Sequence, residues 1–245
     1  MVINQISLNP SSIARVLGAV AFLLVLASIG GQLTAYLTGH DHVYGLVRLF
    51  YVDAERNIPT GFSMILLLFA ALLLAVITVL KRKQTGSPVS HWAILSFGFL
   101  FMAADETCSF HERLVKPVHQ LLGDDNLGVF YFAWVIPGIA LVLILALFFL
   151  KFWLRLPAKT RLTFLTAASL YIGGAIGVEL IGGRFAELHG ERNLTYSMIV
   201  TVEESLEMVG VIIFIWALLV YIADCYKEVR FRIEGVRGEV MIDSP

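Results

Sequence analysis

The chain has 245 residues, 58% of them hydrophobic and only 15% charged, and its mean hydropathy is +0.81. Soluble globular domains are about 45–50% apolar and about 25% charged, so this composition excludes an ordinary soluble domain and indicates a polytopic membrane protein. The net charge is −1, and no basic stripe points to nucleic-acid binding. The two cysteines, Cys108 and Cys225, fall in separate apolar segments, so no disulfide framework or cysteine-based zinc motif is visible.

Six apolar stretches follow one another along the chain, each of about 20 residues or more, the length that crosses a bilayer as a helix. They cover approximately 12–37, 61–81, 90–112, 130–151, 162–183 and 196–224. We predict an all-α fold in which six transmembrane helices form one bundle, with residues 1–245 as a single membrane domain. The first stretch is too long for the apolar core of a signal peptide, so we interpret it as a retained anchor.

Lysine and arginine are unevenly distributed between the segments that flank these stretches. Segments on the side of the N-terminus carry twelve basic residues and those on the opposite side carry six. The positive-inside rule then predicts that both termini are cytoplasmic. Two segments on the outer side, 42–52 and 113–122, have apolar residues at helical spacing, the second broken by Pro117. They are predicted either to lie along the membrane surface or to cover the end of the bundle.

Ionisable residues interrupt three of the six stretches. These residues are Asp105, Glu106, His111, Glu112, Glu179, Glu203, Glu204 and Glu207. A charged side chain at mid-membrane costs roughly 2.5–3.5 kcal/mol, so we expect these groups to face inward and to serve a function. Counted along the helices at 1.5 Å per residue, Asp105, Glu179 and Glu203 all fall in the outer half of the bilayer. We therefore predict a pocket in the outer half rather than a channel through the membrane.

The spacing within each stretch favours a common site. Asp105, Ser109 and Glu112 follow the i, i+4, i+7 pattern and are predicted to share one face of a continuous helix. In the fifth stretch, Ser169, Gly173 and Gly177 recur every four residues. Such a row of small residues lets a neighbouring helix approach closely. Like charges brought together cannot all ionise, so the acids are expected to share protons or to hold a cation.

An oxygen-rich cluster with histidine suits a divalent metal ion such as Zn²⁺, Fe²⁺, Mn²⁺, Mg²⁺ or Ca²⁺. The residues that we predict to bind metal are Asp105, His111, Glu112, Glu179, Glu203 and Glu207. Glu106 and Glu204 are the candidates for a general base toward bound water. The chain would then be a metal-dependent membrane enzyme, a hydrolase or an oxidoreductase, acting on a lipid or another hydrophobic substrate. It contains no Glu-x-x-His pair, so it does not match the di-iron bundle pattern.

Two other classes of function remain open. Intramembrane acids and histidines also relay protons or select cations, so a proton- or cation-handling transporter is the first alternative. A structural subunit of a larger membrane complex is the second. Outer-side residues without an assigned role are Glu55, Asn57, His119 and His189.

Three strings carry a resemblance to a known kind of protein. The first string is ERNIPTGFS, from Glu55 to Ser63. The second consists of Asp105-Glu106 followed by His111-Glu112-Arg113. The third is EESLEM, which begins at Glu203. Together they resemble a family of bacterial multi-pass membrane proteins of uncharacterised activity. The resemblance runs from the second stretch to the sixth, implies no reaction, and adds Glu55 and Asn57 as a lid or fourth side of the site.

Overall fold

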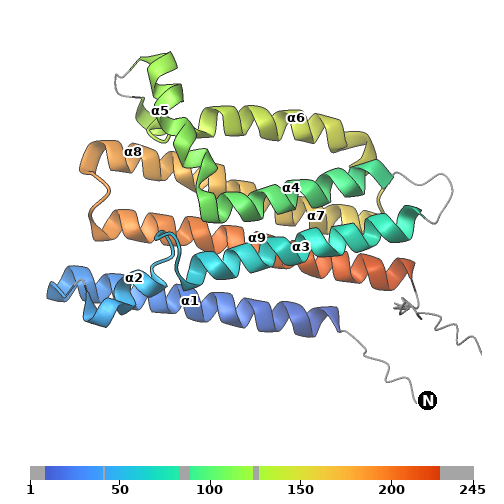
Figure 1. Ribbon diagram of the computed structural model, residues 1–245, viewed down its shortest axis with the longest axis horizontal. Helices are drawn as coiled ribbons and strands as arrows, with labels where there is room; N and C mark the ends of the chain where they lie inside the picture. The colour runs from blue at the N-terminus through green and yellow to red at the C-terminus, as the bar shows by residue number, and fades with distance from the viewer. Residues whose placement is uncertain (1–8, 41, 83–88, 124–126, 227–245) are drawn as a thin grey trace, which may run out of the picture.

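The computed structural model describes residues 9–40, 42–82, 89–123 and 127–226, and within them it is helical throughout apart from turns (Figure 1). The long helices are α1 (Pro10–Thr38), α3 (Ile58–Arg82), α4 (Val89–Cys108), α6 (Val135–Leu154), α7 (Ala158–Ile172), α8 (Glu179–His189) and α9 (Leu194–Cys225). The shorter elements are η1 (Val43–Gly45), α2 (Leu46–Phe50), α5 (Phe110–Leu122), η2 (Gly128–Phe130) and the π-helix η3 (Gly173–Val178). The all-α prediction is confirmed.

Among the residues that the structure describes, five helical segments are long and apolar enough to cross a membrane. One of them joins α7, η3 and α8 into a continuous run of 32 residues, Ala158–His189. The bent pair of α4 and α5 provides a sixth span if it counts as one crossing, with an angle of 79° between its halves. These segments overlap the six predicted stretches, so the chain is a multi-pass membrane protein with five to six candidate spans in its described part.

The helix in the third predicted stretch is broken, and the prediction of a continuous helix there was wrong. Ser109 adopts the left-handed conformation, with φ 48° and ψ 49°, between the end of α4 and the start of α5. A residue with a Cβ rarely adopts this conformation, and it cannot continue a right-handed helix. Asp105 and Glu112 therefore do not share one helix face.

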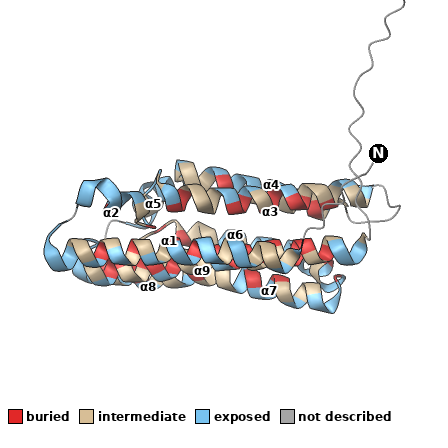
Figure 2. Cartoon of the chain, turned by 90° about the horizontal axis from the view of Figure 1, so that it is seen from below, coloured by how far each residue is buried: buried red, intermediate tan, exposed pale blue. Residues whose placement is uncertain are grey.

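Helix α9 lies at the centre of the bundle and packs against α1, α3 and α7. Met208, Ile215 and Leu218 of α9 are almost fully buried, and Leu66, Leu74 and Ile77 of α3 belong to the same core. Helices α1 and α6 carry many exposed large apolar side chains instead, and exposed residues lie along the outside of the bundle (Figure 2). Apolar side chains therefore lie both in the core and on the outside of the bundle, as expected where hydrocarbon rather than water surrounds it.

The two ends of the bundle differ. The start of α1 and the end of α9 lie at one end, which we name the terminal end (Figure 1). The opposite end, named the α2 end, carries α2, α5 and the turn between α8 and α9. The two outer segments with helical spacing, 42–52 and 113–122, contain α2 and most of α5. Pro117 lies inside α5 rather than ending it, and no residue of α5 is buried.

Two glycines bring α9 into close contact with the α7–η3 segment, and they are not the predicted ones. A Cβ on Gly174 would lie 2.7 Å from the Glu203 carbonyl oxygen, and one on Gly210 would lie 2.8 Å from the Tyr171 backbone nitrogen. By contrast, Cβ atoms at Gly173 and Gly177 would meet nothing within 4 Å. The prediction that Gly173 and Gly177 face the neighbouring helix was wrong. The segment η3 is a π-helix with more residues per turn, so a four-residue spacing does not keep residues on the face that meets α9.

This contact predicts that Gly210→Ala destabilises the bundle by about 1–3 kcal/mol, because the added methyl group meets rigid backbone of α7. The midpoint of thermal unfolding of the detergent-solubilised protein measures the effect. Gly98→Ala is the matched control, since Gly98 lies in α4 with open space around its Cβ position. Equal midpoints for the two variants would contradict the assigned contact.

Candidate functional site

The break at Ser109 turns the chain so that His111 returns to Asp105. Nδ1 of His111 lies 2.6 Å from Oδ2 of Asp105, and the backbone N–H of His111 donates to Oδ1 over 3.0 Å. A carboxylate that accepts from Nδ1 leaves Nε2 of a neutral imidazole free as an acceptor. The pair is thus a histidine with a fixed orientation and one nitrogen available for a proton or another ligand.

Trp134 connects this histidine to α8. Its ring lies 4.8 Å from the His111 ring between centroids, and its Nε1–H donates to Oε1 of Glu179 over 2.8 Å. One aromatic side chain therefore positions a histidine of α5 beside a carboxylate of the α7–α8 span. Sequence reasoning missed Trp134, although a tryptophan next to the start of a membrane span is typical of an amphipathic anchor.

The acids of α9 continue the site into the bundle. Glu203 is buried, with 9% of its surface exposed, and its carboxyl group interacts with that of Glu179. Glu204 and Glu207 are partly buried. The His111 imidazole is close enough to both Glu179 and Glu207 to interact with them electrostatically. The three predicted segments therefore contribute acids to one region of the interior.

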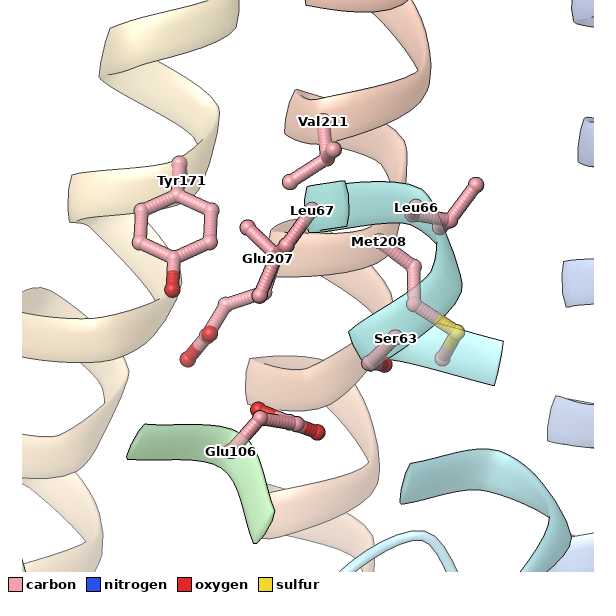
Figure 3. Close-up of a pocket in the computed structure, with 8 residues that line it drawn as sticks. All are labelled: Ser63, Leu66, Leu67, Glu106, Tyr171, Glu207, Met208 and Val211. Carbon is pink, nitrogen blue, oxygen red and sulfur yellow. The ribbon is translucent and has the colours of Figure 1, made fainter. Parts of the chain in front are cut away.

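A small cavity lies deeper between the helices (Figure 3). It is lined by Ser63, Leu66, Leu67, Glu106, Tyr171, Glu207, Met208 and Val211. Glu106 of α4 and Glu207 of α9 lie on its wall, and the Tyr171 hydroxyl points toward the Glu207 carboxyl group, with which it interacts. The space holds about one water molecule. Tyr171 and Ser63 were not foreseen, because nothing in their local sequence distinguishes them from other hydroxyl residues in apolar helices.

A short strap, residues 51–57, covers the site at the α2 end. The Ser109 hydroxyl donates to the Glu55 carboxylate, so the strap is attached to the break between α4 and α5. The Tyr51 hydroxyl donates to Oγ of Ser197 in α9 over 3.3 Å. Burial and the nearby Asp53 carboxylate raise the pKa of Tyr51, which keeps this hydroxyl a neutral donor.

Other residues singled out from the sequence have structural contacts. Asn57 accepts from the backbone N–H of Thr60 over 3.1 Å and donates to the Tyr51 carbonyl oxygen over 2.6 Å, so it caps the start of α3. His119 contacts the Tyr131 carbonyl oxygen through Nε2 at 2.8 Å, which ties α5 to the η2 segment. His189 is exposed and stacks on Phe185. Glu112 is exposed on α5, outside the buried acids.

The predicted metal centre is not preassembled. Within residues 9–40, 42–82, 89–123 and 127–226, no three His, Cys, Asp or Glu side chains are arranged to hold a metal ion. Nor does any ion pair in these ranges join Glu106, Glu179 or Glu207 to a lysine or an arginine. The acids are neighbours of one another: Glu203 interacts with both Glu179 and Glu207, and Glu207 interacts in turn with Glu106.

The contact between His111 and Trp134 predicts a spectroscopic signal. An imidazolium quenches indole fluorescence at van der Waals distance more strongly than a neutral imidazole, so acidification should lower the emission of Trp134. His111→Gln is expected to remove that component, whereas His119→Gln, which changes a histidine without a tryptophan contact, retains it. The measurement is a pH titration of tryptophan emission in detergent. Identical titrations of wild type and His111→Gln would contradict the assigned contact.

Comparison with known proteins gives one match. Residues 16–222 match the model of a domain of unknown function, DUF8692. This range includes all three strings noted in the sequence and every residue of the site described above. No curated protein and no solved structure matches the chain. Since the match covers most of the chain, the protein belongs to the DUF8692 family.

Proposed function

We propose that this membrane protein binds and releases protons at its interior carboxyl groups, and that it does so as a proton- or cation-handling transporter. The observation that carries the proposal is a set of intramembrane acids that no lysine or arginine neutralises among the described residues. Buried carboxylates without such partners are stable only when they hold protons or bind a cation. His111 is a basic group that interacts electrostatically with Glu207, and histidine is the side chain best suited to gain and lose a proton near physiological pH.

The arrangement suggests a path for the proton. Asp105 orients His111, which accepts a proton at Nε2 at the α2 end. From there the proton passes to the pair of Glu179 and Glu203, or to the cavity where Glu106 and Glu207 meet. Each transfer moves one proton between oxygen or nitrogen atoms and breaks no other bond. The strap from residue 51 to 57 lies over the start of this path.

Beyond the cavity the path closes. Met208, Val211 and Ile215 of α9 are buried in an apolar core that extends toward the terminal end. A proton therefore reaches the carboxyl groups from one side only in this conformation. Alternating access requires such closure on one side at a time, so the closed half agrees with a transporter and argues against an open pore.

The second candidate is a metal-dependent enzyme acting on a lipid or another hydrophobic substrate. One observation favours it: a histidine whose Nδ1 donates to a carboxylate is the usual form of a metal-ligating histidine. Nε2 of His111 would then bind the metal together with acids from α8 and α9. Because no three His, Cys, Asp or Glu side chains among the described residues are arranged to hold a metal ion, the site would have to rearrange on binding, which makes this candidate weaker.

The transport proposal predicts proton flux in liposomes that contain the purified protein and a trapped pH indicator, with the membrane potential clamped. His111→Gln and Glu207→Gln should each slow dissipation of an imposed pH gradient at least about tenfold, because each removes a proton-carrying group. Glu191→Gln is the control, since Glu191 is exposed and outside the bundle interior. Flux no faster than that of protein-free liposomes would refute transport of protons.

Metal analysis of the same preparation distinguishes the second candidate. If the enzyme hypothesis holds, stoichiometric metal copurifies with the wild type and is lost in Glu203→Gln/Glu207→Gln, with no proton flux. The proton proposal instead predicts equal, substoichiometric metal in both proteins.

We also propose that the protein lies in a bacterial inner membrane with the terminal end in the cytoplasm, as the distribution of basic residues favours. The two exposed cysteines offer a test, because Cys108 is the last residue of α4, before α5 at the α2 end, and Cys225 is the last residue of α9, which ends at the terminal end. A membrane-impermeant maleimide added to intact cells should label Cys225→Ser but not Cys108→Ser. The opposite pattern would reverse the orientation.

A further inference from the structure

A groove on the outer surface of α8 is unrelated to the acidic site. It is lined by Val129, Leu180, Ile181, Arg184, Phe185 and Leu188. Five of these side chains are apolar, and three of them, Val129, Ile181 and Leu188, are 44%, 61% and 59% exposed. The α8 residues recur at i, i+1, i+4, i+5 and i+8, so they form one stripe along the helix. A single cation, Arg184, interrupts an otherwise apolar stripe.

The packing beneath the groove fixes its shape. A Cβ on Gly183 would lie 3.3 Å from both the Val129 carbonyl oxygen and the Tyr131 Cβ, so the η2 segment packs directly on α8. Oε1 of Glu187 accepts from the Gly128 backbone N–H over 2.9 Å, and Oε2 of Glu187 accepts from Nη1 of Arg184 over 2.5 Å. The guanidinium group of Arg184 is therefore held in one orientation at the groove while its side chain remains 51% exposed.

Arg184 also lies at a defined depth. The run Ala158–His189 has 32 residues, or about 48 Å at 1.5 Å per residue, against a hydrocarbon core of about 30 Å. With the run centred on the hydrocarbon core, about 9 Å extends beyond it at each end, which puts the last turns of α8 at the level of the lipid headgroups. Arg184 is five residues from the end of α8, about 7.5 Å along the axis, with Leu180 and Ile181 deeper.

An arginine at this place needs further hydrogen-bond acceptors. Its guanidinium has five N–H donors, and the residues that the structure describes supply one acceptor group, the Glu187 carboxylate. A phosphate group is the acceptor found at headgroup depth, and it matches the planar guanidinium fork. The acyl chain attached to the same molecule matches the apolar remainder of the groove.

We propose that this groove binds one glycerophospholipid, with its phosphate on Arg184 and one acyl chain along Ile181 and Leu180. The proposal goes beyond the proton-handling function and does not depend on it. Phosphate and acyl chain are both required, so a diacylglycerol with the same chains should bind more weakly.

The test uses the full-length protein in a mild neutral detergent, incubated with phosphatidylglycerol or with diacylglycerol of identical chains. Native mass spectrometry counts the lipid that each protein retains. We expect wild type to retain one phosphatidylglycerol and Arg184→Gln to retain about tenfold less, because glutamine can still bond Glu187 but carries no charge. Arg192→Gln, which removes an exposed arginine at the same end outside the groove, is expected to behave as wild type.

A second variant keeps the test independent of the arginine. Ile181→Trp leaves Arg184 in place and fills the groove, so phosphatidylglycerol retention should fall as well. The proposal is overturned if either Arg184→Gln or Ile181→Trp retains as much phosphatidylglycerol as wild type, or if wild type retains diacylglycerol equally well.

Discussion

The cost of placing a charge in the interior of a membrane bundle constrains this protein more than any other interaction. Acids from α4, η3–α8 and α9 meet inside the bundle, and the described residues offer them no lysine or arginine. Proton sharing between neighbouring carboxyl groups, or a bound cation, is the physical way to keep such groups buried. The pairs that they form, together with Tyr171 and the oriented His111, are the arrangement that such sharing requires.

Two departures from regular helix make this arrangement possible. The left-handed Ser109 ends α4 and returns His111 to Asp105, and the hydroxyl of Ser109 attaches the strap through Glu55. The π-helix η3, which has more residues per turn than an α-helix, ends just before Glu179. Trp134 donates to the Glu179 carboxylate and contacts the His111 ring, so it holds the two side chains near each other. Strained residues and π-helical turns cost stability and recur at functional sites, because they aim side chains where a regular helix would not.

Close contact between helices holds the π-helix η3 against α9. Gly174 and Gly210 let α7–η3 and α9 approach until backbone meets backbone, which leaves little freedom for the acids between them. On the outside of the bundle, α1 and α6 carry exposed apolar side chains, as expected for helices that face a bilayer. The lipid-facing groove at Arg184 belongs to this outer surface, separate from the carboxyl groups within.

The sequence by itself determined the membrane class, the helical fold and the interior acids other than Glu112, which was predicted inside and is exposed. These follow from local properties, because the bilayer sets the length of an apolar stretch and penalises every charge within it. Only the tertiary structure decided which acids pair, that Trp134, Tyr171 and Ser63 share their site, and that Gly174 rather than Gly173 meets α9. Those relations depend on a single left-handed residue, on a π-helical turn and on contacts between distant helices. No spacing rule for regular helices contains that information, which is why the predicted common face of Asp105 and Glu112 failed.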